Sequence, residues 1–170
     1  MFSILGIAFG ALVIGMFLAV MITRTSPPKP IQFAPPEDDE SKDPKDIRVL
    51  ELEDLYRLGE KICEKNELVL KTQIPISDTE VYWVTESKNE LFWGSYVLGF
   101  HKSTPEHPYV SMSTILEFKD FIKSVTSAKG LYLTTGYYTK DVYQPLEGPK
   151  VNLYNRLKVI EEMKQAGISL

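Results

Sequence analysis

An uncharged run at the start of the chain constrains its architecture most strongly. Phe2 to Ile22 make up 21 residues without a charged side chain. As an α-helix, this run is long enough to cross a hydrocarbon core of about 30 Å. We therefore expect a transmembrane helix over residues 1–23. A cleaved signal peptide is the alternative, but no basic segment precedes the run, and the run is longer than the apolar part of a typical signal peptide.

The charges that flank this run predict its orientation. Arg24 and Lys29 follow the run, whereas only the α-amino group precedes it. Because positively charged flanks tend to stay on the cytoplasmic side of a membrane, we expect a single-pass membrane protein whose C-terminal domain is cytoplasmic.

Small residues recur at every fourth position of the expected membrane helix. Gly6 and Gly10 form one set, and Ala11, Gly15 and Ala19 form another. This spacing places each set on one helix face, where a second helix can approach closely, either in a homodimer or in a complex with another membrane protein. The alternative is that these residues reflect only the high frequency of glycine and alanine in membrane helices.

Residues 24–46 differ in composition from both of their neighbours. The stretch from Thr23 to Asp46 contains six of the chain's eleven prolines and six acidic residues. Proline interrupts helices and strands, and the charges oppose collapse into a core. We therefore expect an extended, solvated linker over 24–46, followed by a folded domain over 47–170.

The domain shows a regular order of helix and strand patterns. Apolar residues at helical spacing predict helices over 49–67 and 111–127, and a last helix that begins at Asn155. A capping box is expected at Thr114 and Glu117. Runs of β-branched and aromatic residues predict strands over 68–76, 81–86, 90–100, 130–136 and 150–154. Because a helix joins the third and fourth strands, this order predicts an α/β fold with a mixed sheet flanked by helices.

The charge balance of the domain argues against tight binding to nucleic acid. From Ile47 onward there are 15 basic and 17 acidic residues, whereas DNA-binding domains usually carry a basic excess. A basic surface would require separate lysines to gather after folding, the candidates being Lys119, Lys123, Lys129 and Lys140.

The single cysteine and the two histidines do not predict a disulfide or a metal site. Cys63 is the single cysteine, so it cannot form a disulfide within the chain. His101 and His107 are the only histidines, and a zinc site needs three or four ligands. We therefore expect no bound metal from these residues.

A pattern near the C-terminus carries a family resemblance. In residues 128–163, a predicted strand ends in the Thr-Thr-Gly sequence of 134–136, Thr139 lies in the following turn, and a short helix, a strand and a closing helix come next. This pattern resembles the C-terminal half of Mrr-type restriction endonuclease domains, and the resemblance extends back to about Leu50. It implies a restriction-endonuclease-like fold with a PD-(D/E)xK site that uses Mg²⁺ to cut DNA.

The same resemblance implies that the catalytic residues are missing. In that family, an acid on the second strand and a Glu/Gln-x-Lys pair on the third strand bind the metal and activate water. The resemblance places Tyr82 at the acid, and Leu98 and Phe100 at the two positions on the third strand. Neither Leu98 nor Phe100 can bind Mg²⁺ or carry a positive charge.

A displaced site is the alternative to a degenerate one. It would use Asp78 or Glu80 as the metal ligand and Lys102 as the basic group. Lys102 lies two residues beyond the family's lysine, which keeps it on the same strand face but moves it by about 6–7 Å along the strand.

Three functions fit these observations. The leading hypothesis is a membrane-anchored pseudoenzyme, in which a catalytically inactive restriction-endonuclease-like domain without a cofactor acts as a binding or scaffold module. The second is an active Mrr-type DNA endonuclease with Mg²⁺ at the displaced site. The third is a small accessory subunit of a membrane complex, in which the membrane helix makes most of the contacts.

Overall fold

The computed structural model describes residues 49–88, 94–127, 129–145 and 147–170. The membrane helix expected over 1–23, with its packing residues Gly6, Gly10 and Gly15, lies outside the described residues, as does the linker expected over 24–46. Within the described ranges, no helix combines the length and the apolar character needed to cross a bilayer.

Five strands form one mixed sheet in the order β1-β2-β3-β5-β7. The first three strands are antiparallel neighbours, and the last two continue the sheet parallel to β3. A helix crosses from β3 to β5, because parallel neighbours cannot be joined by a hairpin. The predicted α/β class and mixed sheet are thus confirmed. The strands are β1 (Leu68–Ser77), β2 (Glu80–Ser87), β3 (Ser95–His101), β5 (Lys129–Thr134) and β7 (Lys150–Tyr154).

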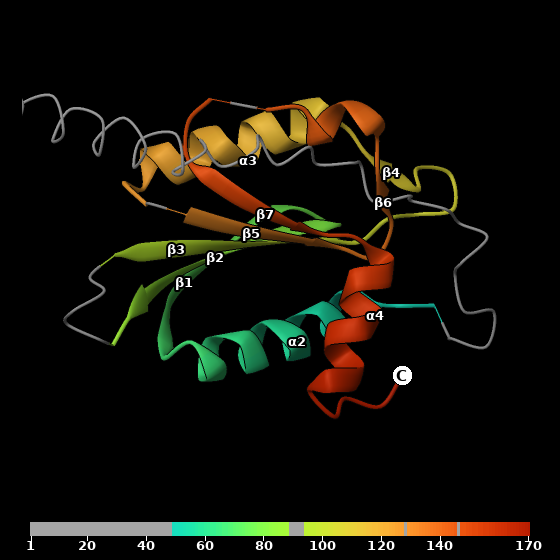
Figure 1. The fold of residues 1–170 in the computed structure, drawn as a ribbon, viewed down its shortest axis with the longest axis horizontal. Helices are drawn as coiled ribbons and strands as arrows, with labels where there is room; N and C mark the ends of the chain where they lie inside the picture. Colours follow the sequence, from blue (N-terminus) through green and yellow to red (C-terminus); the bar gives the residue numbers. More distant parts are fainter. Residues whose placement is uncertain (1–48, 89–93, 128, 146) are drawn as a thin grey trace, which may run out of the picture. The chain divides into compact units, whose positions relative to one another are not determined.

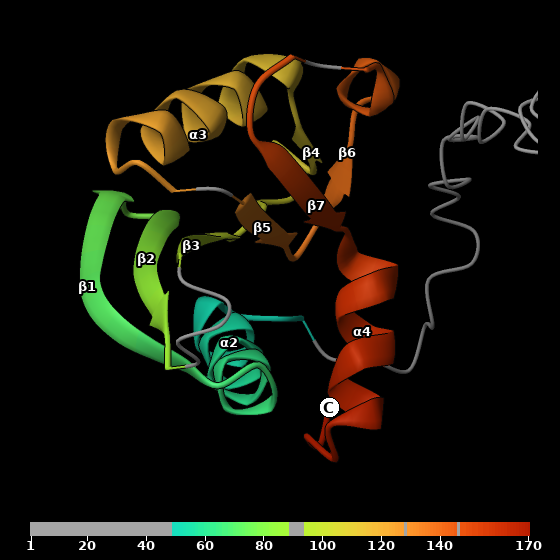
Figure 2. The same ribbon diagram turned by 60° about the vertical axis from the view of Figure 1, so that its left-hand side comes forward.

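Helices cover both faces of this sheet, as Figures 1 and 2 show. The crossover helix α3 (Met112–Ser124) lies on one face, and α2 (Leu52–Lys65) and α4 (Arg156–Gln165) lie on the other. Each face has its own apolar core. The core on the α2 side includes Leu55, Leu58, Trp83, Leu98, Phe100, Leu133 and Met163. The core on the α3 side includes Tyr82, Val97, Phe118, Ile122, Tyr132 and Tyr138.

The ends of two helices test the sequence predictions directly. The Asn155 Oδ1 atom accepts a hydrogen bond from the Lys158 backbone N–H at 2.9 Å, so the predicted start of the last helix is confirmed. The predicted capping box at Thr114 and Glu117 is wrong. The helix α3 begins at Met112 after Ser111, so Thr114 already lies within the first turn.

Two short strands were not predicted. The strands β4 (Tyr109–Val110) and β6 (Tyr137–Tyr138) form a separate parallel pair beside the main sheet. Two residues are too few to show an alternating pattern in the sequence. A 3₁₀ helix, η3 (Lys140–Tyr143), follows β6.

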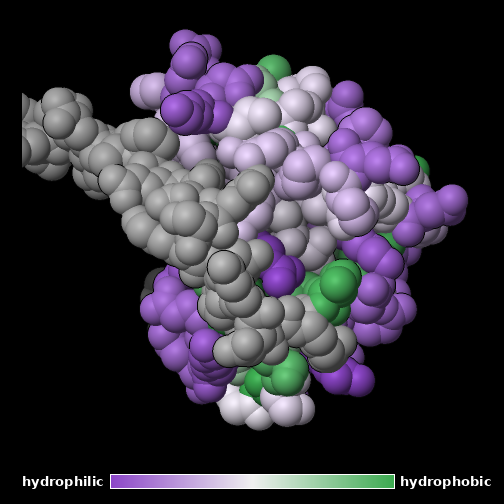
Figure 3. Space-filling view, turned by 90° about the vertical axis from the view of Figure 1, so that its right-hand side faces the viewer, coloured by the Kyte–Doolittle hydropathy of each residue, from purple (hydrophilic) through white to green (hydrophobic). Residues whose placement is uncertain are grey.

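The surface around α4 is mixed in character. Figure 3 faces the side of the domain that carries α4, and the visible surface is mostly hydrophilic with small hydrophobic patches. Isolated apolar side chains of this kind are normal on a protein surface.

Candidate functional site

The pairing of β2 with β3 decides which of the expected site residues share a face of the sheet. Tyr82 lies opposite Gly99, and Leu98 lies opposite Trp83. Tyr82 belongs to the core on the α3 side, whereas Leu98 and Phe100 belong to the core on the α2 side. The expected grouping of the three residues at one site is therefore wrong, because an offset of one residue turns a strand side chain to the opposite face.

The two β3 positions are filled by well-packed core residues. Leu98 is 2% exposed, and Phe100 is fully buried. The Phe100 ring lies 4.6 Å from the Trp83 ring and 5.3 Å from the Tyr56 ring, measured between centroids. A Cβ atom added at Gly59 of α2 would lie only 2.6 Å from Phe100 Cζ. This end of the α2-side face is therefore sealed by direct contact between the helix and the strand.

Tyr82 participates in a buried hydrogen-bonded cluster on the opposite face. The Tyr82 hydroxyl donates to Glu80 Oε1 at 2.8 Å, and the Tyr132 hydroxyl donates to the same oxygen at 2.5 Å. Glu80 is only 8% exposed, so these two donors replace water around its carboxylate. Burial, with a smaller contribution from the Glu80 charge, raises the pKa of both tyrosines above the ordinary value. Both hydroxyls therefore stay protonated and act as donors.

The residues of the expected displaced site are not brought together. Asp78 is exposed in the turn between β1 and β2. Glu80 is held by the two tyrosines on the α3 side, whereas Lys102 forms an ion pair with Glu51 at the start of α2. Among the described residues, no group of three or more His, Cys, Asp or Glu side chains is arranged to hold a metal ion.

The Thr-Thr-Gly motif ties the end of β5 to the loop after β3. The Thr134 hydroxyl accepts from the Gly136 N–H at 3.1 Å and lies 3.1 Å from the Ser103 hydroxyl. The Thr135 hydroxyl accepts from the Ser103 N–H at 2.9 Å. A Cβ atom at Gly136 would lie 2.1 Å from Ser103 Oγ and 2.3 Å from the Pro108 carbonyl oxygen. The described contacts of this motif are thus structural.

The two histidines lie in different surroundings. His101 ends β3 and is partly buried, with Nδ1 3.2 Å from the Thr134 hydroxyl. Burial lowers the pKa of His101, and the Glu80 carboxylate acts in the opposite direction. His107 is exposed in the following loop.

The four lysines proposed as a basic surface do not form one patch. Lys119 and Lys123 of α3 lie together, since an added Cβ at Gly148 would be 3.7 and 3.2 Å from their Cε atoms. Lys129 lies in register with Tyr96 on β3 and therefore faces the α2 side of the sheet, away from α3. Its side chain is thus separated from the α3 lysines by the sheet.

Sequence reasoning missed two features of these sites. Tyr132 lies in the predicted strand 130–136, but its partner Glu80 is 52 residues away. Lys150 pairs with Lys129 across parallel strands. Neither contact has a local sequence signal, because each depends on strand register.

No family model matches the chain, and no curated protein matches it. Among solved structures, the chain is similar to the DNA modification-dependent restriction endonuclease AspBHI, with 15% sequence identity and a TM-score of 0.47. The similarity covers 66% of this chain and 31% of that one, so the chain spans about a third of that protein's length.

Proposed function

We propose that this chain is a membrane-anchored domain of restriction-endonuclease-like type that lacks nuclease chemistry and acts as a binding or scaffold module. The observation that carries this proposal is the burial of Leu98 and Phe100 beneath α2. The family resemblance requires a metal ligand and a lysine at these two positions. Apolar side chains in a dry core offer no oxygen ligand for Mg²⁺ and no cation for the attacking hydroxide.

The state of the nearby polar residues supports the same proposal. Glu80 accepts hydrogen bonds from two tyrosines, and Lys102 is paired with Glu51. A displaced nuclease site would have to break both sets of contacts and bring the two side chains to the same face. Removing a buried carboxylate from its donors costs about 1–3 kcal/mol for each unsatisfied group.

A cleavage assay tests this proposal. The full-length protein, purified in detergent, is incubated with duplex DNA and with single-stranded DNA in the presence of Mg²⁺ or Mn²⁺. We expect no metal-dependent cleavage, and weak binding of duplex DNA at physiological salt because the domain has no basic excess. Cleavage that is lost in Asp78→Ala, Glu80→Gln or Lys102→Ala, but kept in the exposed control Asp120→Ala, would favour an active nuclease.

A second test separates a binding module from an accessory subunit that acts through its membrane helix. Replacing Gly6, Gly10 and Gly15 by Ile adds bulk where two membrane helices would touch. If the membrane helix makes most of the contacts, crosslinking of the full-length chain to its partners is abolished by this triple change. Unchanged crosslinking would assign the contacts to the folded domain.

A further inference from the structure

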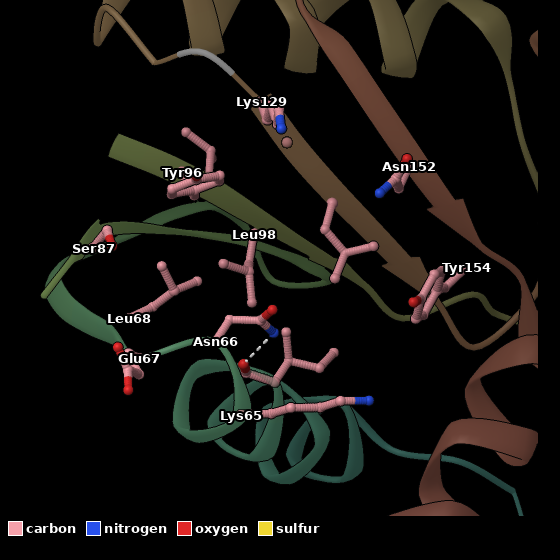
Figure 4. Close-up of a pocket in the computed structure, with 14 residues that line it drawn as sticks. Lys65, Asn66, Glu67, Leu68, Ser87, Tyr96, Leu98, Lys129, Asn152 and Tyr154 are labelled. Carbon is pink, nitrogen blue, oxygen red and sulfur yellow. Dashed lines mark hydrogen bonds between the residues drawn. The ribbon is translucent and has the colours of Figure 1, made fainter. Parts of the chain in front are cut away.

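A groove lies on the α2 side of the sheet, at the end opposite to the sealed Phe100 contact. It has a volume of about 540 Å³ and is lined by the end of α2, by the first residues of β1, β3 and β5, and by Asn152 and Tyr154 of β7. In Figure 4, Lys129 lies between Tyr96 on β3 and Asn152 on β7, and α2 forms the opposite wall. A volume of this size is within the range of small-molecule sites.

The strand register places two lysines side by side at this end. Tyr96, Lys129 and Lys150 are direct neighbours across the three parallel strands, and all three face the α2 side. In the next row, Leu98, Leu131 and Asn152 are neighbours in the same way. Lys129 therefore lines the groove, Lys150 lies beside it on the neighbouring strand just outside the groove lining, and a mainly apolar row lies behind them.

The paired lysines have no charge partner in the described part of the chain. No ion pair joins Lys129 or Lys150 to an acidic side chain there, whereas the exposed strand lysine Lys71 pairs with Glu86 at 2.7 Å. Like charges directly opposite each other destabilise a sheet. A bound anion would remove this repulsion. The groove wall near the end of α2 carries one charge of each sign, at Lys65 and Glu67.

The other groove residues fit a planar, polar ring. The half-buried Leu131 provides an apolar surface, and the half-buried Tyr96 provides an aromatic face. The Asn152 amide offers both a donor and an acceptor. Within the described residues its side chain makes no hydrogen bond, unlike that of Asn66, whose amide donates to the Ile62 carbonyl oxygen at 2.7 Å. Stacking on an aromatic side chain and pairing with an amide are the usual means of holding a nucleobase.

We propose that this groove binds a nucleotide, with the phosphate at Lys129 and Lys150 and the base held by Leu131, Tyr96 and Asn152. The ligand is a free mononucleotide or one unit of a single strand, since both present the same phosphate and base. Duplex DNA is excluded because its bases are stacked and paired. This inference names a ligand class that the proposed function leaves open. Its test measures binding without divalent metal, so its failure would leave the absence of catalysis untouched.

Calorimetric titration of the full-length protein in detergent and EDTA tests this site. The probes are adenosine monophosphate, uridine monophosphate, a single strand of about eight nucleotides and inorganic phosphate. We expect nucleotide binding that is weakened about a hundredfold by Lys129→Ala with Lys150→Ala, because each of the two charge-assisted hydrogen bonds contributes about a factor of ten. Tighter binding of the oligonucleotide than of the mononucleotides would identify a single strand as the ligand, and equal binding would identify a free nucleotide.

Two further variants test whether the loss of nucleotide binding comes from the groove. The pair Lys140→Ala with Lys164→Ala removes the same charge from exposed lysines that do not line the groove, and it should leave binding unchanged. Asn152→Leu should weaken nucleotide binding severalfold while leaving phosphate binding unchanged. The proposal is overturned if no nucleotide binds, if phosphate binds as tightly as the nucleotides, or if both lysine pairs weaken binding equally.

Discussion

The two ends of the α2-side face of the sheet are built differently. At the carboxyl end of β3, Phe100 is fully buried under Gly59, with Trp83 and Tyr56 packed around its ring. At the amino end of the same strand, Tyr96 lies in a row with Lys129 and Lys150, and a groove remains open. Of the positions that the family resemblance assigns to catalysis, Phe100 lies at the sealed end, Leu98 is buried between the two ends, and Tyr82 lies on the opposite face.

One face of the sheet therefore holds both a packed core and an open groove without any change of strand pattern. The glycine at position 59 lets α2 approach the sheet closely at one end, since any larger residue would meet the Phe100 ring. The helix ends at Lys65, and the groove begins at its last residues. Four predictions test this contrast, from the largest expected effect to the smallest.

The largest loss of stability is expected when Phe100, at the sealed end, is replaced by lysine. Phe100→Lys places an ammonium group among the apolar side chains of a buried core, which is expected to lower the free energy of unfolding by about 3–5 kcal/mol. The measurement is urea denaturation followed by circular dichroism.

Leu116→Lys is the control for this change, because Leu116 is 44% exposed on α3. It should alter the free energy of unfolding by less than about 0.5 kcal/mol. A Phe100→Lys protein as stable as the control would mean that the sealed end is open to solvent.

Adding one methyl group should lower stability at the sealed end but not at the open end. Gly59→Ala places a Cβ atom 2.6 Å from Phe100 Cζ, which costs about 1–3 kcal/mol from overpacking, against a gain of up to about 1 kcal/mol from helix propensity. Gly94→Ala, before β3 at the open end, meets no atom within 4 Å and should be neutral or slightly stabilising. Thermal unfolding of both variants provides the comparison, and a Gly94 variant that is the less stable of the two would contradict it.

Much of the fold could be predicted because its signals are local. Helical spacing identified α2, alternation and β-branched content identified β1, β3 and β7, and the Asn155 cap identified the start of α4. The crossover between the third and fourth strands then required a parallel pair.

The face of each residue on β2 could not be predicted in the same way. Both Tyr82 and Trp83 are buried, on opposite sides, because helices cover both faces of this strand. A strand buried on both faces shows a nearly continuous apolar run, so the period of two is lost. The assignment of Tyr82 to the same site as Leu98 rested on the family resemblance, and no period in the sequence of β2 could correct it.

Removing one of the two neighbouring lysines at the open end should stabilise the domain. Lys150→Thr relieves the like-charge contact with Lys129 and favours the strand, so the free energy of unfolding should rise by about 0.2–1 kcal/mol at low salt. The same change at Lys71 removes an ion pair with Glu86 and should not stabilise. Denaturation at low and high salt measures both, and a gain at Lys71 as large as that at Lys150 would argue against repulsion between the lysines.

The smallest expected effect is a pH dependence from His101 at the end of β3. Burial lowers the pKa of His101 in the folded state below its ordinary value of 6.5, so the unfolded chain binds the proton more readily. The contribution of His101 to stability is therefore present above that value and is lost as the pH falls below it. The free energy of unfolding of His101→Asn, compared with the native chain from about pH 8 to about pH 5, should fall less steeply. Parallel curves would show that His101 is not coupled to folding.

A metal titration shows whether the domain has a metal centre near the positions that the family resemblance assigns to catalysis. Mn²⁺ broadens the amide signals of residues near a bound ion, so a titration of the full-length protein followed by nuclear magnetic resonance locates any metal site. The account predicts no saturable broadening centred on residues 80, 82, 98 and 100. Saturable broadening at these residues, displaced by Mg²⁺ and lost in Glu80→Gln, would show that the domain retains a metal centre and would contradict the account.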